Sequence, residues 1–291
     1  MRYRPLGARG QVISAVSLVL EPDSTRRNAG DWVSLIYAAL ECGVSGFEIR
    51  GADAALGEGL AHAFSGVDRR LAFIALRTAG RRGKVLSFEA VGAGVRDTLA
   101  KSGLDYLDAV LLNEPTVAEI PAVRELGALR SAGLVRALGV AGDGEGVEAL
   151  VARGEVDMLA TGYSLLSGWA ERRRLRTAVA ADMAVLGYGV YPHERLQPLT
   201  ERPAKDRARP LAGVGGYGFL EQTKDWTAEE LCLAYALTEP SLATVLLRIQ
   251  SVDHLERLAA VPDREFPPAA AAQIEMARFS PQPERPARRT A

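Results

Sequence analysis

The chain has 291 residues, of which 48% are hydrophobic and 24% are charged, and its formal net charge is −1. These proportions are typical of a globular protein, and such a balanced charge favours neither nucleic acid nor a membrane surface as a partner. No apolar run reaches the ~20 residues of a membrane span, and the first residues lack a secretion signal, so we expect a cytoplasmic protein. The two cysteines and three histidines show neither a disulfide framework nor metal-ligand spacing, so no metal site is predicted.

Short apolar runs alternate with amphipathic segments from one end of the chain to the other. The runs are continuous in hydrophobicity, which is typical of parallel strands that are buried on both faces. The predicted strands are 16–20, 46–49, 71–76, 109–112, 137–140, 158–160, 184–188 and 244–247. Helices predicted between them include 31–41, 88–101 behind the capping residue Ser87, and 226–237 with a capping box of Thr227 and Glu230.

Eight strand–helix units in 291 residues predict a (β/α)8 TIM barrel. A doubly wound sheet is the alternative, but it usually has fewer units and a glycine-rich first turn, which this chain lacks. Residues 1–14 precede the repeating pattern and are predicted to form a β-hairpin that plugs the barrel floor. We expect a single barrel domain over residues 1–279, a long lid-like loop over 194–224 and a disordered tail over 280–291.

Five segments carry a resemblance to a known family. They are 1–15 (MRYRPLGARGQVISA), 39–47 (ALECGVSGF), 102–112 (SGLDYLDAVLL), 130–140 (RSAGLVRALGV) and 163–166 (YSLL). In order and spacing they resemble motifs of the aldo-keto reductase superfamily. The resemblance implies a barrel whose carboxyl-terminal mouth holds a catalytic Asp, Tyr, Lys and His. In that family these four groups deliver a proton to a carbonyl as hydride arrives from NADPH.

The four tetrad positions hold different residues in this chain. Against the family motifs, Glu48 stands for the Asp, Asp53 for the Tyr, Arg77 for the Lys and Asn113 for the His. An arginine stays protonated and cannot relay a proton as lysine can. A carboxylate is no proton donor near neutral pH unless its pKa is strongly raised. The departures therefore imply that NADPH-dependent carbonyl reduction has been lost.

The positions that hold the cofactor in the family also differ. Ala141 and Gly142 replace a Ser-Asn pair that holds the nicotinamide amide, and Ala160 replaces a Gln. The remaining cofactor-binding candidates are Tyr188, for stacking on the nicotinamide, and Arg248, for phosphate. We therefore expect no cofactor, or NADP(H) if a redox function is retained.

The substituted positions end or follow neighbouring strands, on the face where barrel enzymes place their active sites. The predicted catalytic residues are Glu48, Asp53, Arg77 and Asn113. The predicted substrate-binding residues are Arg50, Glu114, Tyr188, Tyr191 and His193. Glu48 or Asp53 would act as a general base and Arg77 would clamp an anionic substrate. The alternative is that Glu48 and Arg77 form only a buried salt bridge.

Three functions follow from these predictions. The favoured one is non-redox acid/base chemistry, such as elimination, isomerisation or cyclisation, on a small polar metabolite in a biosynthetic pathway. The second is a pseudoenzyme that partners or steers another enzyme of its pathway. The third is a divergent NAD(P)H-dependent oxidoreductase. The expected partners are a small, anionic metabolite and a protein of the same pathway, and neither nucleic acid nor membrane.

Overall fold

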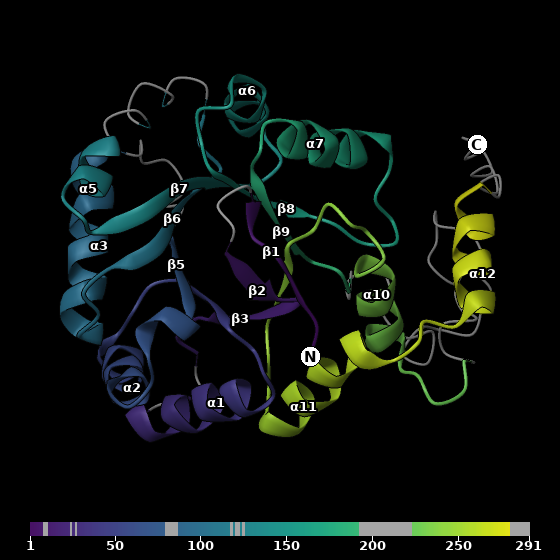
Figure 1. The fold of residues 1–291 in the computed structure, drawn as a ribbon, viewed down its shortest axis with the longest axis horizontal. Helices are drawn as coiled ribbons and strands as arrows, with labels where there is room; N and C mark the ends of the chain where they lie inside the picture. The colour runs from purple at the N-terminus through teal and green to yellow at the C-terminus, as the bar shows by residue number, and fades with distance from the viewer. Residues whose placement is uncertain are drawn as a thin grey trace, which may run out of the picture.

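A computed structural model describes residues 1–7, 11–23, 25–26, 28–78, 87–116, 119, 123, 126–191 and 223–279. Eight parallel strands close into a barrel in the order β10-β3-β4-β5-β6-β7-β8-β9, and helices surround it (Figure 1). This closure confirms the predicted (β/α)8 TIM barrel and rules out the doubly wound sheet, which stays open. The predicted tail, His193 and most of the predicted lid-like loop lie outside the described residues.

The barrel strands match the apolar runs of the sequence closely. They are β3 (Val16–Leu20), β4 (Gly46–Ile49), β5 (Phe73–Arg77), β6 (Leu107–Asn113), β7 (Val135–Ala141), β8 (Met158–Gly162), β9 (Ala184–Tyr188) and β10 (Thr244–Leu247). Strand β5 was predicted to start too early: it begins at Phe73, because Leu71 belongs to a 3-10 turn, η2 (Arg69–Leu71), and is 67% exposed. The predicted strand was too long at its start because Leu71 is apolar although it lies on the surface.

The helices form an outer ring around these strands. They are α1 (Ala29–Glu41), α2 (Ala54–Ser65), α3 (Phe88–Ser102), α5 (Gly127–Ser131), α6 (Glu145–Arg153), α7 (Trp169–Ala180), α10 (Ala228–Ala236), α11 (Val252–Ala260) and α12 (Pro268–Phe279), with a 3-10 turn η6 (Val261–Asp263) after α11. The predicted caps are confirmed: Ser87 accepts from the N–H of Ala90, and Thr227 and Glu230 form a capping box. No helix in the described part of the chain is both long enough and apolar enough to span a membrane.

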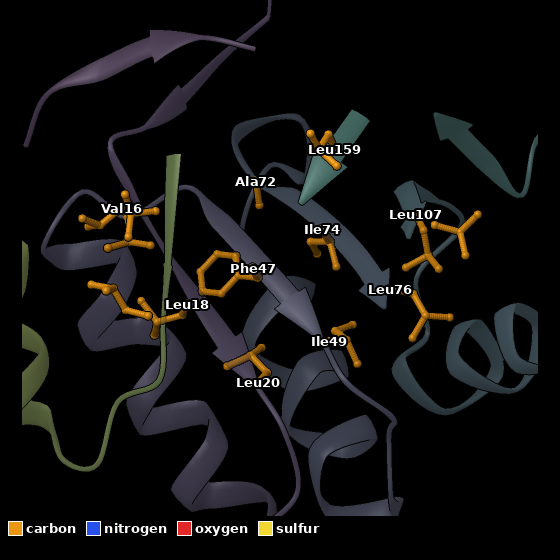
Figure 2. Packing of buried hydrophobic residues seen from close by; sticks show 14 of the residues in the cluster. Val16, Leu18, Leu20, Phe47, Ile49, Ala72, Ile74, Leu76, Leu107 and Leu159 are labelled. Carbon is orange, nitrogen blue, oxygen red and sulfur yellow. The ribbon is translucent and has the colours of Figure 1, made fainter. Parts of the chain in front are cut away.

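Side chains of the strands divide between two hydrophobic layers. Outward residues such as Leu18, Phe47 and Ile74 pack against helix residues that include Trp32 and Leu60, and Figure 2 shows part of this layer. Inward residues fill the barrel and are mostly small, because they meet near its axis. They include Val19, Ala75, Ala109, Leu111, Ala137, Ala141, Met158, Ala160, Leu186 and Leu246.

The amino-terminal segment forms the predicted hairpin. Strands β1 (Tyr3–Pro5) and β2 (Val12–Ser14) pair antiparallel, with Tyr3 opposite Ser14. Leu6 and Ile13 are buried in the inner layer of the barrel, where they contact strand residues. The hairpin therefore covers part of the amino-terminal end of the barrel, as predicted.

Candidate functional site

Three of the four predicted catalytic residues lie on adjacent strands at the carboxyl-terminal mouth. Glu48 lies in β4 and is fully buried, Arg77 is the last residue of β5 and Asn113 the last of β6. Strand β4 pairs with β5, and β5 pairs with β6. The barrel therefore places these three side chains next to one another in space, although they are far apart in the sequence.

Asp53 has a different position from the other three. It follows β4 as the N-cap of α2, where its carboxylate accepts a hydrogen bond from the N–H of Leu56 at 2.8 Å. The residue is exposed, and such a cap typically stabilises a helix by ~1 kcal/mol. Asp53 therefore has a local structural role, and Glu48 is the better-placed candidate for a general base.

Glu48 shares one carboxylate oxygen between two arginines. Arg50 Nε donates to Glu48 Oε1 at 2.5 Å, and Arg77 Nη1 lies 3.7 Å from the same oxygen. The second oxygen, Glu48 Oε2, is buried and has no hydrogen-bond partner among the described residues. A buried carboxylate needs hydrogen bonds or opposite charges to replace the water that it has lost. Among the described residues, only one of the two oxygens of Glu48 has such partners.

Arg77 contacts Glu48 through one nitrogen and the Tyr188 ring through its guanidinium, while two of its nitrogens have no partner among the described residues. Its side chain is 7% exposed, and its Cζ lies 4.6 Å from the centre of the Tyr188 ring, which is a cation–π distance. Nε and Nη2 are buried without a hydrogen-bond partner in the described part of the chain. Leaving buried donors unpaired costs ~1–3 kcal/mol each, so these atoms point to a ligand or to water.

Tyr188 ends β9 and lies beside this pair. Burial raises the pKa of its hydroxyl above the ordinary value of 10.0, and the negative charges of Asp143 and Glu114 act in the same direction. The guanidinium of Arg77 opposes them without reversing the shift. Tyr188 therefore stays protonated near neutral pH and can donate a hydrogen bond to a substrate oxygen.

The carboxylate of Glu114 binds backbone N–H groups at the start of α6. Its two carboxylate oxygens accept from the N–H groups of Asp143 and Gly144 at 3.2 and 3.3 Å, at the start of α6. The backbone at Gly142 has a φ of +127°, and a Cβ there would lie 2.1 Å from Glu114 Oε1. Glycine is therefore required at 142 to admit Glu114, whose negative charge is favourable at a helix N-terminus.

A second polar cluster at the mouth was missed from the sequence. Asp143 Oδ1 accepts from Thr161 Oγ1 at 2.7 Å and from Arg174 Nη1 at 2.6 Å. Arg174 also contacts Glu148 Oε1 at 3.2 Å, and its side chain is only 7% exposed. Arg174 stands in the charged run ERRRLR, which is typical of a solvated helix face. Burial of Arg174 could have been predicted from its position on the same side of α7 as the apolar residues Leu175 and Ala178.

The remaining predicted residues have varied surroundings. Asn113 is half-buried, and its backbone N–H donates to Thr78 Oγ1 at 3.1 Å. Tyr191 packs against the hydrophobic cluster of α10, which includes Leu231, so its ring serves packing. The described residues contain no group of three or more His, Cys, Asp or Glu side chains that could hold a metal ion.

A large cavity of about 770 Å³ lies at the other end of the barrel. Its lining includes Phe73, Val135, Met158 and Ala184, which start their strands, and Leu6 of the hairpin. Barrel enzymes place their chemistry at the carboxyl ends of the strands. The size of this cavity therefore gives no reason to move the candidate site away from Glu48 and Arg77.

The positions at which the resemblance places a nicotinamide ring offer it few polar groups. Ala141, the last residue of β7, and Ala160, in the middle of β8, are fully buried and have no polar side-chain atom. The space beside Gly142 is occupied by the carboxylate of Glu114. Tyr188 remains as an aromatic surface, but its ring already packs on a guanidinium. These described residues do not fit a nicotinamide.

The residues at the positions that would hold the cofactor phosphates already have other contacts. Arg248 Nη2 lies 2.6 Å from Glu21 Oε2, and the Arg248 side chain is 67% exposed. Ser251 uses its hydroxyl to cap α11 by accepting from the N–H of His254. Among the described residues at these positions, a phosphate would therefore have to displace existing contacts.

Comparisons with known proteins agree with this architecture. The sequence model of the Aldo/keto reductase family matches residues 39–278. The fold is similar to an aldo-keto reductase from Bacillus halodurans, with a TM-score of 0.75 to its holo form and 0.71 to its apo form, at 18% identity over 95% of this chain and 96% of that chain. A putative aldo-keto reductase from Pseudomonas aeruginosa gives a TM-score of 0.63 at 20% identity, over 93% of this chain and 95% of that chain. No curated protein matches the sequence.

Proposed function

The chain belongs to the aldo/keto reductase family, and we propose that it uses the family's barrel for non-redox acid/base chemistry on a small, polar, anionic metabolite. The observation that carries this proposal is the buried pair of Glu48 and Arg77, in which each side chain keeps polar atoms that have no partner in the described part of the chain. Glu48 acts as the general base. Arg77 binds the negative charge of the substrate.

The residue types at the mouth support proton transfer without hydride transfer. Reduction of a carbonyl needs a proton donor beside the carbon that receives hydride. At three of the four tetrad positions, Glu48, Arg77 and Asn113 supply a base, a fixed cation and a neutral amide instead. The described residues at the family's cofactor positions are alanines, a glycine and side chains that are already engaged.

A balanced reaction can be written with these groups. Glu48 removes a proton from a carbon next to a carbonyl or carboxyl group, and the electron pair of the C–H bond moves into that group. Arg77 stabilises the negative oxygen that forms, and the Tyr188 hydroxyl can donate a hydrogen bond to it. Return of the proton to another carbon gives isomerisation, and departure of a group from the neighbouring carbon gives elimination.

Two measurements test this function. Titration with NADPH and NADP+, followed by fluorescence, is expected to show no submicromolar binding. In deuterated water, the protein is expected to exchange the C3 protons of 2-oxobutanoate faster than buffer does. Glu48→Gln should lower that exchange at least ~100-fold, because loss of a general base typically costs 10²–10⁴ in rate.

Glu58→Gln is the matched control, because it removes the same charge from an exposed position of α2. It should exchange as the unmodified protein does. Submicromolar NADPH binding would overturn the proposal in favour of a divergent NAD(P)H-dependent oxidoreductase. Equal exchange by the Glu48→Gln and Glu58→Gln proteins would remove Glu48 from the mechanism.

A second candidate function is that of a pseudoenzyme that partners a pathway enzyme. The contact that favours it is the short ion pair between Glu48 and Arg50, which neutralises the carboxylate without any ligand. In that case Glu48→Gln and Arg77→Met would leave product formation in a producing host unchanged. Substitutions of surface residues would lower it instead.

A further inference from the structure

We infer that Arg50 is an anion-binding residue at the mouth, and that a carboxylate bound to its guanidinium makes Glu48 a stronger base. The inference rests on the proposed function for the role of Glu48. It adds Arg50 to Arg77 as a binding residue for the anion and states how ligand binding influences the general base. It requires no contact between the ligand and Glu48.

Arg50 is the most accessible of the three charged side chains of this group. Its side chain is 17% exposed, whereas those of Glu48 and Arg77 are 1% and 7% exposed. The unpaired nitrogens of Arg77, Nε and Nη2, are buried. A ligand that arrives from solvent can therefore contact Arg50 with less rearrangement than contact with Glu48 or Arg77 requires.

Arg50 binds Glu48 through a single nitrogen. Nε donates to Glu48 Oε1 at 2.5 Å, while Nη1 and Nη2 have no hydrogen-bond partner among the described residues. Unlike the unpaired nitrogens of Arg77, these two are not buried. They form the end edge of the guanidinium, whose two parallel N–H groups match the two oxygens of a carboxylate. This edge does not include Nε, so it stays complete while Arg50 holds Glu48.

The charge of the group also favours an anion. Arg50 and Arg77 contribute two positive charges and Glu48 one negative charge, so the net charge of the three residues is +1. A carboxylate brings a charge of −1 and neutralises the group, whereas a cation would be repelled by the two arginines.

An anion on Arg50 changes the electrostatic environment of Glu48. The positive charge of Arg50 stabilises the carboxylate form of Glu48 and therefore weakens it as a base. An anion on the end edge offsets part of that charge, so Glu48 accepts a proton more readily. Coupling between two sites is reciprocal. The negative charge of Glu48 must therefore weaken the binding of the anion to Arg50 by the same factor.

Binding of acetate tests the anion site, with acetamide as the neutral molecule of the same shape. Acetate should shift the nitrogen-15 signal of the Arg50 Nε–H group saturably, and acetamide should not. Arg50→Lys keeps the charge but has no end edge, so it should weaken acetate binding ~5-fold or more in calorimetry. Arg70→Lys is the matched control and should bind acetate as the unmodified protein does. Arg70 also holds a carboxylate through Nε, that of Asp68 at 3.1 Å, but its side chain is 82% exposed.

Glu48→Gln tests the coupling by the direction of its effect. Loss of the negative charge should tighten acetate binding ~5-fold or more, which is within the usual range of coupling between sites. If the ion pair only holds Arg50 in place, the same substitution would weaken binding or leave it unchanged. Glu58→Gln removes the same charge from an exposed position of α2 and should leave acetate affinity unchanged.

Proton exchange of a neutral ketone tests the effect on the base. Butanone has no anionic group, so acetate bound to Arg50 supplies the missing charge. Acetate should therefore raise the rate at which the protein exchanges the protons of butanone in deuterated water, after subtraction of the rate due to acetate alone. The increase should be lost in Arg50→Lys and retained in Arg70→Lys.

Four results would overturn the inference. They are no shift of the Arg50 signal by acetate, equal acetate affinity in the Arg50→Lys and Arg70→Lys proteins, weaker or unchanged binding in Glu48→Gln, and butanone exchange that acetate does not accelerate. The first result needs no variant, so it decides even if Arg50→Lys fails to fold. The binding tests do not depend on the reaction. Coupled acetate binding in a protein that exchanges no protons would keep the anion site and remove the proposed function.

Discussion

Two arginines are buried at the mouth of the barrel, and they differ in how fully they are paired. Arg174 contacts Asp143, Thr161 and Glu148 at 2.6 to 3.2 Å. Arg77 has a single ion-pair contact, at 3.7 Å, and two nitrogens without a partner among the described residues. Arg174 leaves only Nε without a partner there, so most of its donors are satisfied by the protein itself, as is usual for buried polar groups. The larger unused capacity of Arg77 therefore makes it the better candidate for a binding residue.

Tyr188 gives a pH dependence at this scale. Burial, Asp143 and Glu114 raise its folded-state pKa above 10.0, so the folded protein holds the phenol proton more tightly than the unfolded chain. Stability from this group is fully present below pH 10 and is lost as the pH rises through the folded-state pKa. We predict that Tyr188→Phe makes thermal stability fall less steeply between pH 10 and the folded-state pKa of Tyr188. Tyr37→Phe, which removes the same hydroxyl from a 41% exposed position, is the control substitution.

At the scale of helices and strands, the local sequence predicts where these elements lie better than it predicts which of their side chains are buried. The apolar runs and the capping residues Ser87 and Thr227 gave the positions of strands and helices because those signals act over a few residues. Leu71 and Arg174 were misleading for one reason. Exposure of Leu71 and burial of Arg174 depend on neighbours that are distant in the sequence. The contact between Glu48 and Arg77 was predicted as an alternative, because the resemblance placed both residues at tetrad positions and the predicted barrel makes their strands neighbours.

Arg174 ties α7 to the turn that starts α6, and its removal should weaken that junction. Breaking a fully buried ion pair costs about 3–5 kcal/mol. Asp143 and Glu148 are 53% and 43% exposed, so water can replace part of the lost contacts. We predict that Arg174→Met lowers the free energy of unfolding by ~2 kcal/mol in urea denaturation. Arg176→Met, at an exposed position of the same helix, should stay within ~0.5 kcal/mol of the unmodified protein.

For the molecule as a whole, the two ends of the barrel have separate roles. The hairpin buries Leu6 and Ile13 at the amino-terminal end, while Glu48 and Arg77 lie toward the carboxyl-terminal end. The parallel arrangement makes this division, because every strand ends at the same face of the barrel. Stability at one end and binding at the other should therefore respond to different substitutions.

This separation predicts that a core substitution in the hairpin spares the candidate site. Ile13 is fully buried, so Ile13→Ala should lower the free energy of unfolding by ~3 kcal/mol through loss of buried methyl groups and a residual cavity. Val12→Ala, at a neighbouring position that is 65% exposed, should change it by less than ~0.5 kcal/mol. Glu48-dependent proton exchange, measured well below the unfolding temperature, should be the same in both proteins. A folded Ile13→Ala protein with slower exchange would show instead that the hairpin and the mouth are coupled through the alanine-rich interior.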